Sequence, residues 1–186
     1  MADAPPADLN EISRDLLQVL PDEIQEKSTQ AFDALQEGAS FGDIYGIEPR
    51  KLEMVYSVAH TYYKNRKYED ALKMFRFLTL MDHTNQKFWM GFASTQQMQK
   101  EYEKAVEAFG YATLLDVENP KPQLQAGYCL LQMKKYDEAR AALQGVLLID
   151  DIDDKTKLQA EALMARVRRG ETEVSDEESG AESSDD

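Results

Sequence analysis

Cysteine, histidine and long apolar stretches are scarce in this chain of 186 residues, which has one cysteine and two histidines. The single cysteine, Cys129, excludes an intramolecular disulfide and suits a reducing compartment. His60 and His83 have no second histidine or cysteine at metal-ligand spacing, so we expect no metal site. The sequence also lacks an N-terminal signal peptide and an apolar run of membrane-spanning length. These absences predict a soluble, cytosolic protein.

Motifs that carry catalysis are missing as well. The sequence has no glycine-rich phosphate loop and no nucleophile motif. Carboxylates are abundant, but they fall on expected exposed helix faces and in turns, where they are solvated by default. We therefore expect neither an enzyme nor a bound cofactor.

Positive charge is also in short supply. The formal net charge is -14 and the isoelectric point is about 4.6, which argues against nucleic acid and anionic membranes as partners. Part of the negative charge is local, because residues 171–186 hold eight acidic residues and no basic one. This tail has too few apolar side chains to bury a core, and we predict that it is disordered.

What the chain does contain is a unit of 34 residues, present in three copies between residues 52 and 153. Each copy has a tyrosine-led tetrad: Tyr68-Glu69-Asp70-Ala71, Tyr102-Glu103-Lys104-Ala105 and Tyr136-Asp137-Glu138-Ala139. Other columns keep the same period, namely Ala59, Ala93 and Gly127, then Phe75, Phe109 and Leu143, then Asp82, Asp116 and Asp150. Small residues let two crossing helices approach closely. The pattern is typical of tetratricopeptide repeats, and it predicts an all-α superhelix of three repeats, 52–85, 86–119 and 120–153.

The flanks of the repeats have weaker signals. Residues 1–8 are expected to be disordered, and residues 9–51 to form two helices and a packed linker. The first of these helices carries a leucine-rich stripe that either folds back on the first repeat or pairs with a second chain, and we favour a homodimer; the stripe consists of Leu9, Ile12, Leu16 and Leu20. The second begins at Asp22 and ends near Gly38. After the repeats, residues 154–170 predict a capping helix that stops at Gly170.

The first helix of each repeat is expected to line a concave groove. Its second, fifth, ninth, twelfth and thirteenth residues face that side in the usual repeat geometry. They give Glu53, Lys87, Lys121 and Gln132, together with a candidate site of Tyr56, His60, Tyr63, Lys64, Met90, Ser94, Gln97, Met98, Leu124, Tyr128 and Leu131. Tyrosines offer rigid contact area and methionines adapt their shape, so the lining suits an extended apolar peptide better than an acidic one. The alternative is that Tyr63, Leu124 and Leu131 only fill space between helices.

Two stretches of the sequence resemble the class II chaperones of bacterial type III secretion, the LcrH/SycD-like family. They are the first repeat, with Tyr56-Ser57-Val58-Ala59, Tyr63 and Lys67-Tyr68-Glu69-Asp70-Ala71, and the linker, with Glu37-Gly38-Ala39-Ser40 and Asp43-Ile44-Tyr45-Gly46-Ile47. The likeness covers roughly residues 33–169, although Arg66 and Thr84 depart from the family pattern. It implies a cytosolic bacterial chaperone that binds hydrophobic translocator proteins through an extended segment, typically Pro-x-Leu-x-x-Pro. Tyr56 and Tyr63 would line its pockets, with Tyr68 nearby.

Other functions are less well supported by the sequence. Repeat domains that clamp the acidic C-terminus of a heat-shock chaperone need a lysine and two asparagines at places that Tyr56, His60 and Gly91 occupy here. A generic tetratricopeptide scaffold is the main alternative, because Ser175 and Ser183 lie in acidic surroundings that resemble kinase sites. An enzyme would need an activity with no visible residues.

Overall fold

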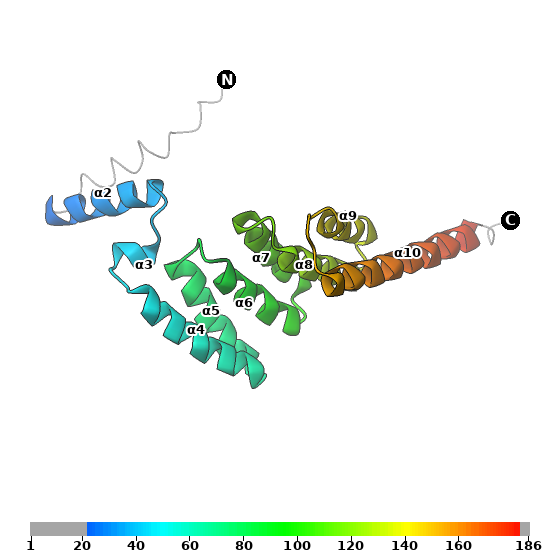
Figure 1. The fold of residues 1–186 in the computed structure, drawn as a ribbon, viewed down its shortest axis with the longest axis horizontal. Coiled ribbons are helices and arrows are strands. Elements are labelled where there is room, and N and C mark those ends of the chain that lie inside the picture. The colour runs from blue at the N-terminus through cyan, green and yellow to red at the C-terminus, as the bar shows by residue number, and fades with distance from the viewer. Residues whose placement is uncertain (1–21, 183–186) are drawn as a thin grey trace, which may run out of the picture. The chain divides into compact units, whose positions relative to one another are not determined.

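The computed structural model describes residues 22–182, and the structural statements below concern that part of the chain, which contains helices and no strand. The chain divides into two units, residues 1–48 and 49–186, and each is described by itself. Figure 1 shows the helices of each unit.

The first unit contains α2 (Asp22–Gln36) and α3 (Phe41–Ile44). Helix α2 begins at Asp22 and ends just before Gly38, as predicted. The packed linker holds a one-turn helix that the sequence analysis missed. Its start is a reciprocal capping box, in which the Asp43 amide donates to Ser40 Oγ (3.2 Å) and the Ser40 amide donates to Asp43 Oδ2 (2.8 Å). The stripe of Leu9, Ile12, Leu16 and Leu20 lies outside the described residues, so its role in a homodimer stays a prediction.

The second unit is a stack of three helical hairpins and a long last helix. The hairpins are α4 (Pro49–Lys64) with α5 (Tyr68–Met81), α6 (Gln86–Met98) with α7 (Tyr102–Leu115), and α8 (Pro120–Gln132) with α9 (Tyr136–Leu147). Each helix packs against the next one along the chain, and α10 (Asp154–Glu182) packs on α8 and α9 (Figure 1). The predicted all-α repeat superhelix is confirmed.

The repeating columns form the core of this stack. All five alanines of the two small-residue columns are fully buried: Ala59, Ala93, Ala71, Ala105 and Ala139. Phe75, Phe109 and Leu143 are at most 1% exposed. At Gly127 an added Cβ would lie 2.8 Å from the Leu143 side chain, so the third hairpin needs a residue without a side chain there. The sequence columns are therefore the places where crossing helices touch.

The turns within the three hairpins share an unusual backbone. Arg66, Lys100 and Lys134, which are 34 residues apart, have φ of 60°, 63° and 59°. This left-handed conformation favours glycine, and a side chain there is destabilising by roughly 1 kcal/mol. All three repeats nevertheless place a basic residue at this position.

We expect Arg66→Gly to raise the free energy of unfolding by about 1 kcal/mol, because glycine removes the strain of the left-handed backbone. Urea denaturation measures this change. Lys67→Gly is the matched control, since Lys67 has φ of -83° and gains nothing from glycine. A lower denaturation midpoint for Arg66→Gly would show that its side chain stabilises the turn by more than the strain.

The end of the last helix differs from the prediction. We expected a stop at Gly170 followed by a disordered tail, but α10 continues to Glu182. Gly170 is buried, and an added Cβ would lie 2.3 Å from the Tyr136 ring, so this glycine lets α10 approach the third hairpin closely. Glu171 then pairs with Arg140 of α9. Glutamate, which recurs after residue 170, is a good helix former and carries the helix onward.

Candidate functional site: a groove of three pockets

The first pocket of the groove lies between the first two repeats and has a volume of about 170 Å³. We call it the aromatic pocket; it is lined by Tyr56, His60, Tyr63, Phe75, Met90, Gly91 and Ser94. Five of these residues were predicted to face the groove, and the structure brings all five together. Phe75 and Gly91 were not among the predicted site residues: Phe75 belongs to a repeating core column, and Gly91 was considered only as a position of the carboxylate clamp.

Phe75 and Gly91 build one wall of the aromatic pocket together. The Phe75 side chain is 1% exposed, and a Cβ on Gly91 would lie 2.3 Å from its ring. The Phe75 ring can occupy this position because residue 91 has no side chain. Tyr56 packs its ring edge-on against Phe75, with centroids 5.7 Å apart, and stacks on His60 at 5.9 Å. Aromatic contacts on both sides hold the Tyr56 ring in one orientation.

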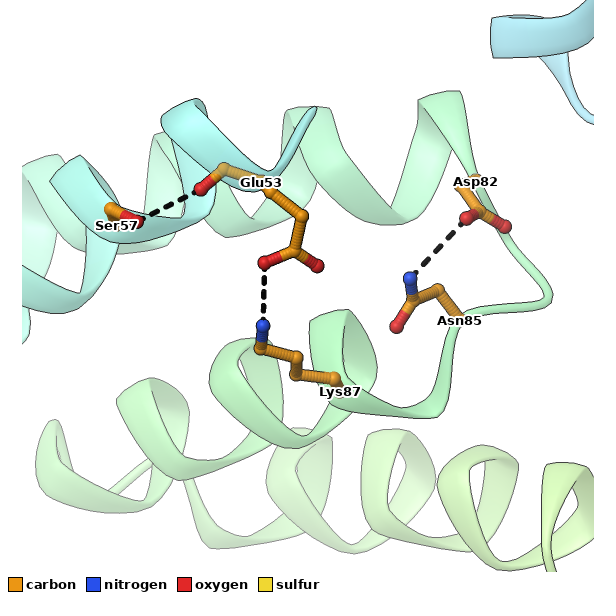
Figure 2. Close-up of polar contacts among 5 residues, drawn as sticks. All are labelled: Glu53, Ser57, Asp82, Asn85 and Lys87. Atoms are coloured by element: carbon orange, nitrogen blue, oxygen red, sulfur yellow. Dashed lines mark hydrogen bonds and ion pairs between the residues drawn. The ribbon is translucent and has the colours of Figure 1, made fainter. Parts of the chain in front are cut away.

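An ion pair lies beside this pocket and joins the first helices of two repeats. Lys87 Nζ of α6 lies 2.6 Å from Glu53 Oε2 of α4. Figure 2 shows the two side chains pointing toward each other from these helices. The same ammonium lies 4.0 Å from the centre of the Tyr56 ring, which is a cation–π distance. Both charged side chains are about half exposed, so the pair adds little stability. The pair does, however, place the Lys87 ammonium over the Tyr56 ring.

Figure 2 also shows how the neighbouring turn is organised. Asn85 Nδ2 donates to Asp82 Oδ2 (3.3 Å), while the Asp82 Oδ1 accepts from the amide of Thr84 (3.2 Å). Asp82, the first residue of the aspartate column, therefore organises the turn that leads into α6, the helix that carries Lys87.

Tyr63 is partly buried in the lining of the aromatic pocket. Burial raises its pKa above the usual value, and the nearby Tyr68 raises it further. The phenol is thus neutral and able to donate a hydrogen bond. Tyr68 contacts the Tyr63 ring edge-on at 5.8 Å, but neither Tyr68 nor Lys64 lines any of the three pockets described here.

The second pocket has a volume of about 520 Å³ and is rich in side-chain amides. We call it the amide pocket; its lining is Gln97, Met98, Lys100, Tyr102, Leu124, Gln125, Tyr128, Gln159 and Leu163. Gln97 Nε2 donates to Gln125 Oε1 at 3.0 Å across α6 and α8. Four of these residues were predicted. Gln159 and Leu163 were missed because they belong to α10, which lies outside the repeats.

Cys129 lies behind the amide pocket and is fully buried. Burial raises the pKa of its thiol to about 11, against a smaller opposite effect of its hydrogen bond with Gln97. The thiol is therefore neutral at physiological pH and unreactive as a nucleophile.

The third pocket, of about 370 Å³, is lined by three basic residues. We call it the basic pocket; its lining is Leu131, Gln132, Lys134, Tyr136, Arg166, Arg169 and Gly170. Leu131, a predicted site residue, and Gln132, which was also predicted to face the groove, both line it. Leu131 and Leu124 are 8% and 4% exposed and belong to the core cluster of the third repeat, so these two mainly fill space between helices.

The three pockets follow one another along shared helices. Ser94 of the aromatic pocket and Gln97 of the amide pocket lie three residues apart on α6, which is about 4.5 Å along the helix. Tyr128 of the amide pocket and Leu131 of the basic pocket are equally close on α8. Neighbouring pockets are therefore close to one another along the stack of repeats. Metal-binding clusters of three or more His, Cys, Asp or Glu are absent from residues 22–182. In the same range no helix is both long and apolar enough to cross a membrane.

Comparison with known proteins supports the repeat assignment. The tetratricopeptide-repeat family pattern matches residues 52–85 and 87–119. Chaperone protein SicA of Salmonella typhimurium is 33% identical over 67 residues, which is 36% of this chain and 41% of SicA. Low calcium response locus protein H of Yersinia pestis is 35% identical over 63 residues, covering 34% of this chain and 38% of that protein. The chain thus matches about two fifths of the length of these curated relatives.

A solved structure extends the similarity over more of the chain. The Yersinia enterocolitica type III secretion chaperone SycD, in complex with a peptide of the translocator YopD, is 27% identical, with a TM-score of 0.62. The alignment covers 68% of this chain and 97% of SycD.

Proposed function

Since the chain belongs to the LcrH/SycD-like family of tetratricopeptide-repeat chaperones, we propose that it holds a segment of a hydrophobic translocator protein in its groove. Holding keeps the translocator soluble and unassembled in the bacterial cytoplasm before type III secretion. The segment is extended and of the Pro-x-Leu-x-x-Pro kind. The proposal involves binding alone, with no catalysis, cofactor, nucleic acid or direct membrane contact.

The observation that carries this proposal is the aromatic pocket. A volume of about 170 Å³ suits one apolar side chain or a proline ring, and the lining offers aromatic faces with phenol and imidazole groups at their edges. Tyr56 is already oriented by Phe75, His60 and Lys87, so little side-chain freedom is lost when a ligand enters.

The chemistry of the ligand follows from the same arrangement. A segment spaced by prolines is extended before it binds and loses less conformational entropy on docking. A translocator with exposed apolar stretches aggregates when free in water. Occupying part of such a stretch is a binding equilibrium, which explains how holding works without a nucleotide.

The test is binding of a labelled peptide of about ten residues that contains Pro-x-Leu-x-x-Pro. We expect saturable binding in the micromolar range, and at least tenfold weaker binding when aspartate replaces the leucine, because a carboxylate is not solvated in the aromatic pocket. Fluorescence anisotropy measures both. Equal affinity for the two peptides would contradict the proposal.

A further inference from the structure

The basic pocket is lined by positively charged residues, although the chain as a whole has a net charge of -14. The sequence has 35 acidic and 21 basic residues, yet the seven residues that line this pocket include three cations and no carboxylate. In the described part of the chain, Lys134 and Arg166 form no ion pair. Because neither cation has an ion-pair partner among the described residues, the pocket favours an anionic group.

The second and third repeats both place a lysine of a pocket lining in the turn between the two helices of the hairpin, which we call the hairpin corner. The residues of the basic pocket Leu131, Gln132, Lys134 and Tyr136 are equivalent, 34 residues on, to Gln97, Met98, Lys100 and Tyr102 of the amide pocket. Lys100 and Lys134 both have the left-handed backbone conformation, which glycine adopts at a lower energetic cost. Strained residues of this kind are commonly found where a side chain has a role in binding.

Helix α10 turns the second of these corners into a cationic site. It supplies Arg166 and Arg169, and it comes close enough to do so because Gly170 leaves room for the Tyr136 ring. A guanidinium presents two parallel N–H groups that match the geometry of a carboxylate. At the corresponding corner in the second repeat, the next helices contribute Gln125, Gln159 and Leu163 instead.

We infer that the basic pocket binds an acidic side chain of the same polypeptide that the aromatic pocket holds. This inference rests on the proposed function and names the chemistry of its ligand further. The ligand is an extended segment whose apolar residues occupy the aromatic pocket and whose aspartate or glutamate lies at the far end of the groove. The residues that bind the carboxylate are Lys134 and Arg166, beside Arg169, and none of them occupies the positions of the carboxylate clamp at 56, 60 and 91.

The experiment compares three forms of the Pro-x-Leu-x-x-Pro peptide on the full chain: unextended, extended by four glutamates, and extended by four glutamines. Extensions are placed at each end in turn, because either peptide direction is possible in a groove. At low salt we expect the glutamate form to bind about fivefold more tightly than the glutamine form at one of the two ends. Salt should reduce this ratio, since half-exposed ion pairs are screened.

Variants locate the effect. Lys134→Gln/Arg166→Gln should bind the glutamine peptide as the wild type does and lose the preference for glutamate. Lys155→Gln/Lys157→Gln removes the same charge from exposed residues of α10 that line none of the three pockets, and it should keep the preference. All four side chains are exposed, so these variants should fold.

Three results would overturn the inference. The first is that the glutamate and glutamine peptides bind with equal affinity, whichever end carries the extension, while the unextended peptide still binds. If none of the peptides binds, the proposed function itself is refuted. The second is a preference that survives in Lys134→Gln/Arg166→Gln. The third is self-association of the chain that this variant abolishes, because the pocket would then hold the acidic tail of a second copy; sedimentation velocity measures it.

Discussion

Phe75→Ala is expected to lower the free energy of unfolding by about 3–5 kcal/mol and to remove binding of the translocator-type peptide. The side chain is 1% exposed, touches Tyr56 edge-on and forms one wall of the aromatic pocket. Truncating a buried phenylalanine loses its transfer free energy and leaves a cavity. A cavity at this place also frees the Tyr56 ring. Urea denaturation followed by circular dichroism gives the stability, and anisotropy gives the binding.

Phe77→Ala is the matched control for this prediction, because it lies on the same helix and is 43% exposed. We expect it to lower the free energy of unfolding by less than about 1 kcal/mol and to leave peptide binding unchanged. Similar losses for Phe75→Ala and Phe77→Ala would mean that the assigned face of α5 is wrong.

Gly91→Ala is the second substitution for which we expect a large loss of stability and peptide binding, although it adds only one methyl group. Its Cβ would lie 2.3 Å from the Phe75 ring, which is itself buried and closely packed. We expect a loss of about 1–3 kcal/mol from overpacking, together with at least tenfold weaker peptide binding as the ring is pushed into the pocket. The same denaturation and anisotropy measurements apply.

Gly110→Ala gives the opposite result in a comparable helix. An added Cβ at Gly110 meets nothing within 4 Å, so the only effect is the better helix propensity of alanine. We expect a gain of about 0.5–1 kcal/mol. If both glycine variants stabilised the protein, the close contact between residue 91 and Phe75 would be refuted.

Much of the repeat stack was predictable because its signal is periodic. Ala71, Ala105 and Ala139 recur at 34 residues, and each is fully buried where two helices cross. The same register placed Tyr56, His60, Tyr63, Met90 and Ser94 on one side, and these five line one pocket. When a residue lies on the first helix of a repeat, its position in the repeat predicts whether it faces the groove.

What could not be predicted depends on contacts between elements that break the period. Gly170 read as a helix stop, but in the structure it makes room for Tyr136, a residue 34 positions away. Gln159 and Leu163 reach the amide pocket from a helix that belongs to no repeat. Ser40 and Asp43 are the exception, since the capping-box spacing was visible in the sequence and was not used.

The leucines of the third repeat show the limit of the repeat rule. Leu124 and Leu131 occupy the same columns as Met90 and Gln97, yet they are 4% and 8% exposed, because α10 covers this end of the stack. Position in the repeat gives the direction of a side chain, whereas its exposure depends on which helix packs next to it.

The central claim is that the aromatic pocket holds the peptide, and Tyr56→Ala/Tyr63→Ala tests it most directly. The measurement is the anisotropy of a labelled Pro-x-Leu-x-x-Pro peptide titrated with the wild type and with this variant, after circular dichroism has shown that both are folded. Tyr62→Ala/Tyr111→Ala is the control, since it removes two tyrosines that line none of the three pockets. We predict micromolar binding to the wild type and control, and at least tenfold weaker binding to Tyr56→Ala/Tyr63→Ala. Equal binding by all three folded proteins would contradict the account.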